Sequence, residues 1–168
     1  MIKTLQQNIF LFILLVLLQV GVLNNIQLGS YLNPYMYVLF ILLLPINTPN
    51  WLVLVVSFIL GLIIDMFADT IGMHASATVF MGFLRPLILQ AITNRDNYDS
   101  GTSPRIHYFG FFWFLKYTLV LVFSHHLFLF TVEMFNFYSF HLVLWRTVLS
   151  TLFTSLLVIL SQYVIYRK

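Results

Sequence analysis

Long apolar runs dominate the chain and limit the folds that it can adopt. A helix needs about 20 predominantly apolar residues to cross the roughly 30 Å hydrocarbon core of a bilayer. Five runs approach or reach that length, at residues 5–23, 51–68, 73–92, 108–130 and 142–166. A sixth run, residues 35–46, is shorter and contains Pro45, so we predict a short or broken helix there. Tyr35 and Tyr37 lie at its start, where interfacial aromatic side chains are expected.

The composition agrees with a membrane protein. Hydrophobic residues make up 61% of the 168 residues, charged residues make up 8%, and the mean hydropathy is +0.95. Soluble domains carry roughly 25% charged residues, so we predict an all-α integral membrane protein with one transmembrane domain over residues 1–168. No small-x-small cleavage site follows the first run, which we interpret as an uncleaved helix. The absence of cysteine excludes disulfides and thiolate metal ligands, and the few cations form no nucleic-acid patch.

The positions of the cations predict the topology. Lysine and arginine in short loops stay on the cytoplasmic side of a membrane. Six crossings place all the terminal and loop cations on one side, whereas five crossings separate the two basic ends. These residues are Lys3, Arg95, Arg105, Arg167 and Lys168. We therefore predict a six-helix transmembrane bundle with both termini in the cytoplasm.

Small residues recur at four-residue spacing on the run at residues 51–68 and continue on the run at residues 73–92. These residues are Ser57, Gly61, Ala75 and Gly82. Small side chains let membrane helices approach closely. We predict a tight hairpin of these two helices that turns near Gly72, with the small residues in a packing role.

Two carboxylates lie near this turn, and the deeper one needs a partner. Asp65 lies about one helical turn inside the membrane, and an ionisable group at that depth indicates a functional or paired site. We predict an ion pair with Arg146, and the alternative is that Arg146 extends to the nearby interface. Asp69 either caps the turn or meets solvent. Together with Gly72 and His74, these residues form a predicted polar crevice on the outer side.

Three further residues lie toward the cytoplasmic half of the predicted bundle. Pro86 removes a main-chain donor and predicts a kink in the fourth helix. Arg85 is predicted to bind carbonyl groups freed there or a lipid headgroup, and Lys116 to extend its amine to the interface.

The polar residues form no recognisable catalytic or metal motif. An aspartyl protease dyad brings its two carboxylates from different helices, and here both lie on one. His125 and His126 point to different helix faces, and metal-binding histidine spacings do not occur. Glu133 is explained by an interfacial hydrogen bond. We therefore predict a protein without enzymatic activity, resident metal or cofactor.

One motif resembles a known family. It runs Gly61-x3-Asp65-x3-Asp69-x2-Gly72-x-His74-Ala75 and is followed by Phe83-x-Arg85-Pro86. This pattern is similar to the signature of the MreD family of bacterial rod shape-determining membrane proteins, whose length and span number also agree. The family's Gly, Asp and Gly correspond to Gly61, Asp65 and Gly72, and the other positions are typical of a subset.

The resemblance implies a fold and partners. The fold would be similar to the S component of energy-coupling vitamin transporters, and the location would be the bacterial inner membrane. The direct partner would be MreC, within an elongation complex that includes MreB, the RodA glycosyltransferase and a penicillin-binding transpeptidase, and that regulates peptidoglycan synthesis. We expect the outer crevice to contribute to MreC binding. A homodimer is a further alternative.

Two other functions remain open from the sequence. A small-molecule-binding component of a vitamin-type transporter would use the same crevice, and would prefer several Trp, Asn and Glu contacts around it, of which few are expected here. A scaffold that binds membrane lipid through Arg85 and Lys116 is the third alternative.

Overall fold

The structure is a computed structural model that describes residues 2–26, 32–92, 101–134 and 140–165. Within these ranges all regular structure is helical. The helices are α1 (Ile2–Gly21), η1 (Leu23–Asn25), η2 (Met36–Val38), α2 (Leu39–Leu43), α3 (Asn50–Ala68), α4 (Met73–Ile92), α5 (Ile106–Phe109), α6 (Phe111–Met134) and α7 (Phe140–Ile165). Here η1 and η2 are single 3₁₀ turns.

Among the described residues, five helical stretches are long and apolar enough to cross a membrane: α1 with η1, α3, α4, α6 and α7. This confirms the prediction of an all-α, multi-pass membrane protein. The ends of α4 coincide with the predicted run, and α3 begins one residue earlier than predicted. The predicted run at residues 108–130 is divided at Gly110, whose φ of 82° separates α5 from α6. A glycine accepts this left-handed conformation without strain.

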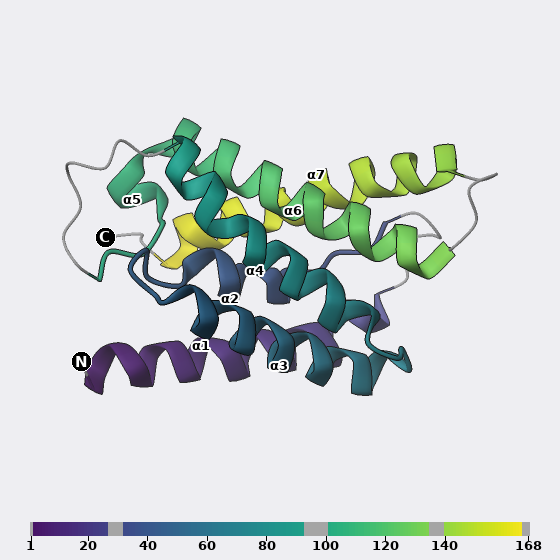
Figure 1. Cartoon of the computed structure of the whole chain (residues 1–168), viewed down its shortest axis with the longest axis horizontal. Helices are drawn as coiled ribbons and strands as arrows, with labels where there is room; N and C mark the ends of the chain where they lie inside the picture. The colour runs from purple at the N-terminus through teal and green to yellow at the C-terminus, as the bar shows by residue number, and fades with distance from the viewer. Residues whose placement is uncertain (1, 27–31, 93–100, 135–139, 166–168) are drawn as a thin grey trace.

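The helices form a bundle with a short helix inside it. Figure 1 shows α1 and α3 along one side, α6 and α7 along the other, and α4 crossing between them. The first turn of α1 and the last turn of α7 lie at the same end. The chain between α1 and α3 runs through the middle, and residues 36–44 are all buried. We call residues 33–45 the interior segment.

The interior segment corrects one prediction. Tyr37 was expected at a membrane interface, but it is 0% exposed and belongs to the hydrophobic core. The segment contains only one 3₁₀ turn and the five residues of α2. Main-chain groups outside regular helix are tolerated at membrane depth only where protein or water satisfies them. The surrounding helices meet this requirement with side chains.

A glutamine of α1 binds the start of η2. Gln19 is fully buried, its Oε1 accepts from the Met36 N–H at 2.8 Å, and its Nε2 donates to the Pro34 carbonyl at 3.0 Å. Nε2 also donates to Asn24 Oδ1 at 2.8 Å. One side chain thus satisfies a donor and an acceptor of the irregular backbone, which explains an amide at the end of the apolar stretch of α1.

Two hydroxyls of α7 bind the same part of the segment. The Asn33 N–H donates to Ser150 Oγ at 3.1 Å, and the Tyr35 N–H donates to Thr154 Oγ1 at 3.2 Å. Ser150 and Thr154 are four residues apart and therefore share a helix face. The polar stripe on α7 consequently serves as a set of acceptors for an extended chain.

Arg85 binds the other end of the segment. It is 1% exposed, and its Nη2 donates to the carbonyls of Leu44 and, at 3.3 Å, Pro45. Its Nε donates to the Tyr117 hydroxyl at 3.1 Å, which in turn donates to the Leu42 carbonyl at 3.1 Å. The prediction that Arg85 binds carbonyls freed by Pro86 in α4 is wrong, because the carbonyls that it binds belong to the interior segment. The carbonyls are the unpaired ones at the end of α2, where a cation is favourable.

The other two residues of this predicted group, Pro86 and Lys116, lie within long helices. Pro86 lies inside α4, where it supplies no N–H to the helix. Lys116 is exposed on α6, away from the core.

The small residues of α3 and α4 face one another across the hairpin. A Cβ added at Gly61 would lie 2.6 Å from the His74 carbonyl oxygen and 2.7 Å from the Ala75 nitrogen, so the two backbones are in contact there. A Cβ at Gly82 would lie 2.6 Å from Ser57 Oγ. The backbone contact at Gly61 lies near the turn, where the polar residues gather.

Candidate functional site

The Asp65 carboxylate caps the beginning of α4. It is 2% exposed, and its Oδ1 and Oδ2 accept from the His74 and Ala75 N–H groups, each at 2.9 Å. The Thr70 hydroxyl also donates to Oδ1 at 2.5 Å. The first N–H groups of a helix have no intrahelical partner and carry partial positive charge. Asp65 is therefore stabilised by a helix N-terminus.

Asp69 has a different position in the turn. It follows α3 in the left-handed conformation with φ of 52°, and its N–H donates to the Asp65 carbonyl. Its side chain is exposed. Gly72 also has a positive φ, 74°, and completes the reversal before α4. Asp65 is thus a buried helix cap, whereas Asp69 is an exposed carboxylate.

The predicted ion pair of Asp65 with Arg146 is wrong. Arg146 Nη1 lies 2.9 Å from Glu133 Oε2, and the guanidinium carbon lies 4.1 Å from the centre of the Phe130 ring. With the Asn33 amide turned to match its surroundings, its carbonyl oxygen accepts from Arg146 Nε and Nη2, both at 2.9 Å. The reason is that the helix N-terminus already satisfies Asp65, whereas α6 and α7 bring Glu133 directly beside Arg146.

A double-mutant cycle tests this assignment. We expect the changes Glu133→Gln and Arg146→Gln to couple by up to about 1 kcal/mol in unfolding free energy, because the pair is partly exposed to solvent. Asp65→Asn and Arg146→Gln should be additive within about 0.5 kcal/mol. Unfolding of the purified chain in mild detergent provides the measurement. Coupling of Arg146 with Asp65 that exceeds its coupling with Glu133 would contradict the assignment.

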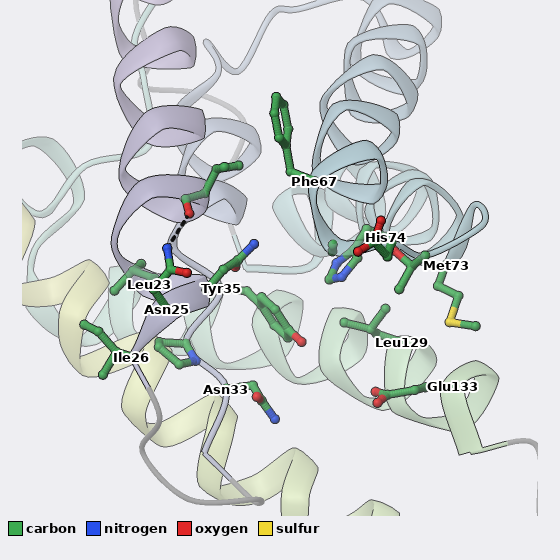
Figure 2. Close-up of a pocket in the computed structure, with 16 residues that line it drawn as sticks. Leu23, Asn25, Ile26, Asn33, Tyr35, Phe67, Met73, His74, Leu129 and Glu133 are labelled. Carbon is green, nitrogen blue, oxygen red and sulfur yellow. Dashed lines mark hydrogen bonds between the residues drawn. The ribbon is translucent and has the colours of Figure 1, made fainter.

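A polar pocket of about 420 Å³ opens beside this turn. Figure 2 shows it between the end of α1, the α3–α4 turn and the end of α6, with Tyr35 in the middle. The lining residues are Val20, Leu23, Asn24, Asn25, Ile26, Asn33, Pro34, Tyr35, Phe67, Ala68, Asp69, Thr70, Met73, His74, Leu129 and Glu133. Polar side chains therefore converge from the interior segment and three helices.

The structure brings together part of the predicted crevice. Asp69 and His74 line the pocket, whereas Asp65, Gly72 and Arg146 do not. Asp65 and Gly72 shape the adjoining turn, and Arg146 forms an ion pair with Glu133, which lines the pocket. The predicted crevice residues therefore divide into two that face the pocket and three that position its walls.

Sequence reasoning missed a buried network of histidine and tyrosine. The Tyr37 hydroxyl lies 2.9 Å from His74 Nδ1 and 2.9 Å from His125 Nε2. A tyrosine hydroxyl donates one hydrogen bond, so one of these ring nitrogens carries a proton and the other accepts. His74 connects this network to the pocket, since it also belongs to the lining.

His126 extends the network to α7. Its Nδ1 lies 2.7 Å from the Val122 carbonyl, so this nitrogen is the donor, and its Nε2 lies 3.3 Å from Thr154 Oγ1. The His125 and His126 rings are 5.4 Å apart, and Tyr35 lies 5.4 Å from His126. The prediction that adjacent histidines point to different faces overlooked the interior segment, which presents aromatic rings to both. The close alternation of Tyr35 and Tyr37 was the available signal.

The described residues contain no group of three or more His, Cys, Asp or Glu side chains that could hold a metal ion. No family model, curated protein or solved structure matches the chain. The site is a polar pocket with neutral and acidic walls beside the α3–α4 turn.

Proposed function

We propose that the chain is a non-enzymatic membrane scaffold of the bacterial rod complex that binds MreC and helps to regulate peptidoglycan synthesis and cell shape. The MreD-like motif supports this proposal, because its Gly61 and Asp65 build the α3–α4 turn. MreB, RodA and the transpeptidase would be indirect partners. The inner membrane is the corresponding location.

One surface feature carries the docking part of the proposal. Ile71, in the α3–α4 turn, is 98% exposed, and it lies between Asp69, which faces the polar pocket, and Gly72. In this proposal the exposed Ile71 side chain, beside the rim of the polar pocket, is the contact that the partner covers. A single transmembrane helix with its adjoining segment would reach this end of the bundle and cover Ile71.

Affinity purification of the tagged full chain from its own bacterium tests this proposal. We expect a single-span, coiled-coil protein to be retained, and Ile71→Glu to reduce its recovery severalfold. Asn47→Glu is the matched control, because Asn47 is exposed in the connection between α2 and α3. The proposal would be contradicted if Ile71→Glu recovered as much of the partner as the unmodified chain, or if the unmodified chain recovered no such protein.

The proposed topology has six crossings, with the interior segment as the second and both termini in the cytoplasm. The topology is supported by Figure 1, in which the first turn of α1 and the last turn of α7 lie at the same end of the bundle. Lys3, Arg167 and Lys168 would then lie on the cytoplasmic side, as the positive-inside rule favours. The pocket and Ile71 would face outward.

Cysteine labelling tests this orientation cleanly, because the chain has no cysteine. In spheroplasts, a membrane-impermeant maleimide should label Ile71→Cys and leave Asn47→Cys unlabelled until the membrane is permeabilised. The opposite pattern, or labelling of both positions in intact spheroplasts, would reject six crossings with a cytoplasmic N-terminus.

The pocket itself favours a second candidate function. Its volume of about 420 Å³ lies within the range of small-molecule sites, roughly 300–1,000 Å³. Asn24, Asn25, Asn33 and Glu133 line it, more amide contacts than the sequence led us to expect, although the described lining contains no Trp. A vitamin-type carrier would retain a stoichiometric metabolite on purification and associate with energising subunits.

A further inference from the structure

Two polar groups in the pocket have no hydrogen-bond partner among the described residues. His74 is 4% exposed and Tyr37 binds its Nδ1, but its Nε2 is unpaired. The Tyr35 hydroxyl is also unpaired. Figure 2 shows Tyr35 and His74 beside the open volume, and their ring centres are 5.1 Å apart. Neither group belongs to the buried side-chain atoms that lack a partner, so both are accessible from the pocket. Polar groups that converge on a pocket fix the orientation of a bound ligand.

The buried network determines what His74 offers to that ligand. His125 Nδ1 is fully buried without a partner. A bare nitrogen is the better tolerated form there, because buried unpaired N–H groups are the rarest. His125 therefore carries its proton on Nε2 and donates to the Tyr37 oxygen, and Tyr37 donates to His74 Nδ1. Neutral His74 then holds its proton on Nε2, as a donor into the pocket.

The charges of the lining restrict the ligand further. Asp69 and Glu133 are the charged side chains in the described lining, which includes no lysine or arginine. Arg146 is bound by Glu133 and Asn33. An anionic ligand would meet two carboxylates without a free cation. A fitting ligand presents an uncharged oxygen to the His74 donor and an N–H or O–H to a carboxylate.

We propose that this pocket binds a secondary amide of an extended peptide segment, whose carbonyl oxygen accepts from His74 Nε2–H and whose N–H donates to a lining carboxylate. A peptide main chain presents both an acceptor and a donor without net charge, and the pocket offers His74 as the donor and Asp69 and Glu133 as the acceptors. The inference rests on the proposed scaffold function, since the peptide is the segment that adjoins the partner's transmembrane helix.

Nitrogen NMR of the full chain in phosphatidylcholine nanodiscs, with ¹⁵N-labelled histidine rings, tests the proton arrangement. We expect neutral His74 and His125 with the proton on Nε2, and neutral His126 with the proton on Nδ1. Tyr37→Phe removes the hydroxyl that connects two of the rings, so the His74 and His125 resonances should change while those of His126 stay. A His74 proton on Nδ1 in the unmodified chain would overturn the inference.

Binding is tested with N-acetyl-alanine N′-methylamide as the probe. It should shift the His74 Nε2 resonance and the methyl signal of Met73, which lines the pocket, and leave the methyl signal of the exposed Met66 unchanged. His74→Gln keeps a donor and should bind comparably, whereas His74→Leu should weaken binding up to about tenfold. Shifts with sodium phosphate or butylammonium but not with the amide would overturn the inference.

Two further arms separate this inference from the alternatives. If phosphatidylethanolamine in the nanodisc shifts Met73 and abolishes the response to the amide, the site is a lipid site and the inference fails. If the purified chain retains a metabolite that occupies the pocket, it also fails. Recovery of the partner with the unmodified chain would still support the scaffold function in either case, so the two failures are distinguishable.

Discussion

We expect Gly61→Ala to destabilise the chain, by roughly 1–3 kcal/mol in unfolding free energy. The new Cβ would lie within 2.7 Å of main-chain atoms of His74 and Ala75, and a backbone cannot rotate away as a side chain can. The helices α3 and α4 would have to separate. Alanine favours an exposed helix over glycine by about 1 kcal/mol, so the sign of the measured change shows which effect dominates.

Two other glycines provide a graded control for this experiment. A Cβ at Gly82 meets Ser57 Oγ, the end of a side chain that can change rotamer, and a Cβ at Gly21 meets nothing within 4 Å. Thermal unfolding in detergent should therefore rank Gly61→Ala as the least stable variant, Gly82→Ala as intermediate and Gly21→Ala as at least as stable as the original chain. A Gly61→Ala variant as stable as Gly21→Ala would contradict the backbone contact between α3 and α4.

Replacement of Asp65 by alanine should have the other large effect, a loss of about 2–4 kcal/mol. The change leaves the buried His74 and Ala75 N–H groups without an acceptor, and an unpaired buried donor costs about 1–3 kcal/mol. Asp65→Asn should lose less, because one amide oxygen still accepts, but it removes the negative charge from the helix N-terminus. Unfolding free energies in detergent measure both changes.

Asp69→Asn is the matched control for Asp65→Asn. Both substitutions replace a carboxylate by an amide in the same turn, and asparagine tolerates the left-handed conformation of position 69. Since Asp69 is exposed, its substitution should change stability by less than about 0.5 kcal/mol. Equal losses at the two positions would mean that Asp65 does not act through the N-terminus of α4.

The sequence was sufficient for the elements that depend on local signals. The apolar run at residues 73–92 coincides with α4, because Gly72 precedes it directly and its hydrophobic pattern is continuous. The short run ending near Pro45 is a 3₁₀ turn followed by a five-residue helix. Run length and proline position were enough to predict that this segment is not an ordinary span.

The site could be predicted only in part, because its contacts join distant parts of the chain. Arg146 lies at a similar predicted depth to Asp65, but depth does not specify the helix face, and the contact made is with Glu133. Likewise, Tyr37 contacts His74 and His125, which come from two other helices. Periodicity gives the face of each helix separately, whereas this network depends on an irregular segment between them.

The interior segment also constrains how the chain is assembled in the membrane. Side chains of α1, α4, α6 and α7 satisfy its main-chain groups, and three of these helices are synthesised after it. Unpaired main-chain groups are costly in hydrocarbon, so the segment cannot be released into lipid as it leaves the ribosome. It has to remain in a wet or protein-lined environment until Arg85, Tyr117 and Thr154 arrive. A segment near the beginning of the chain is therefore among the last to reach its final position during biogenesis.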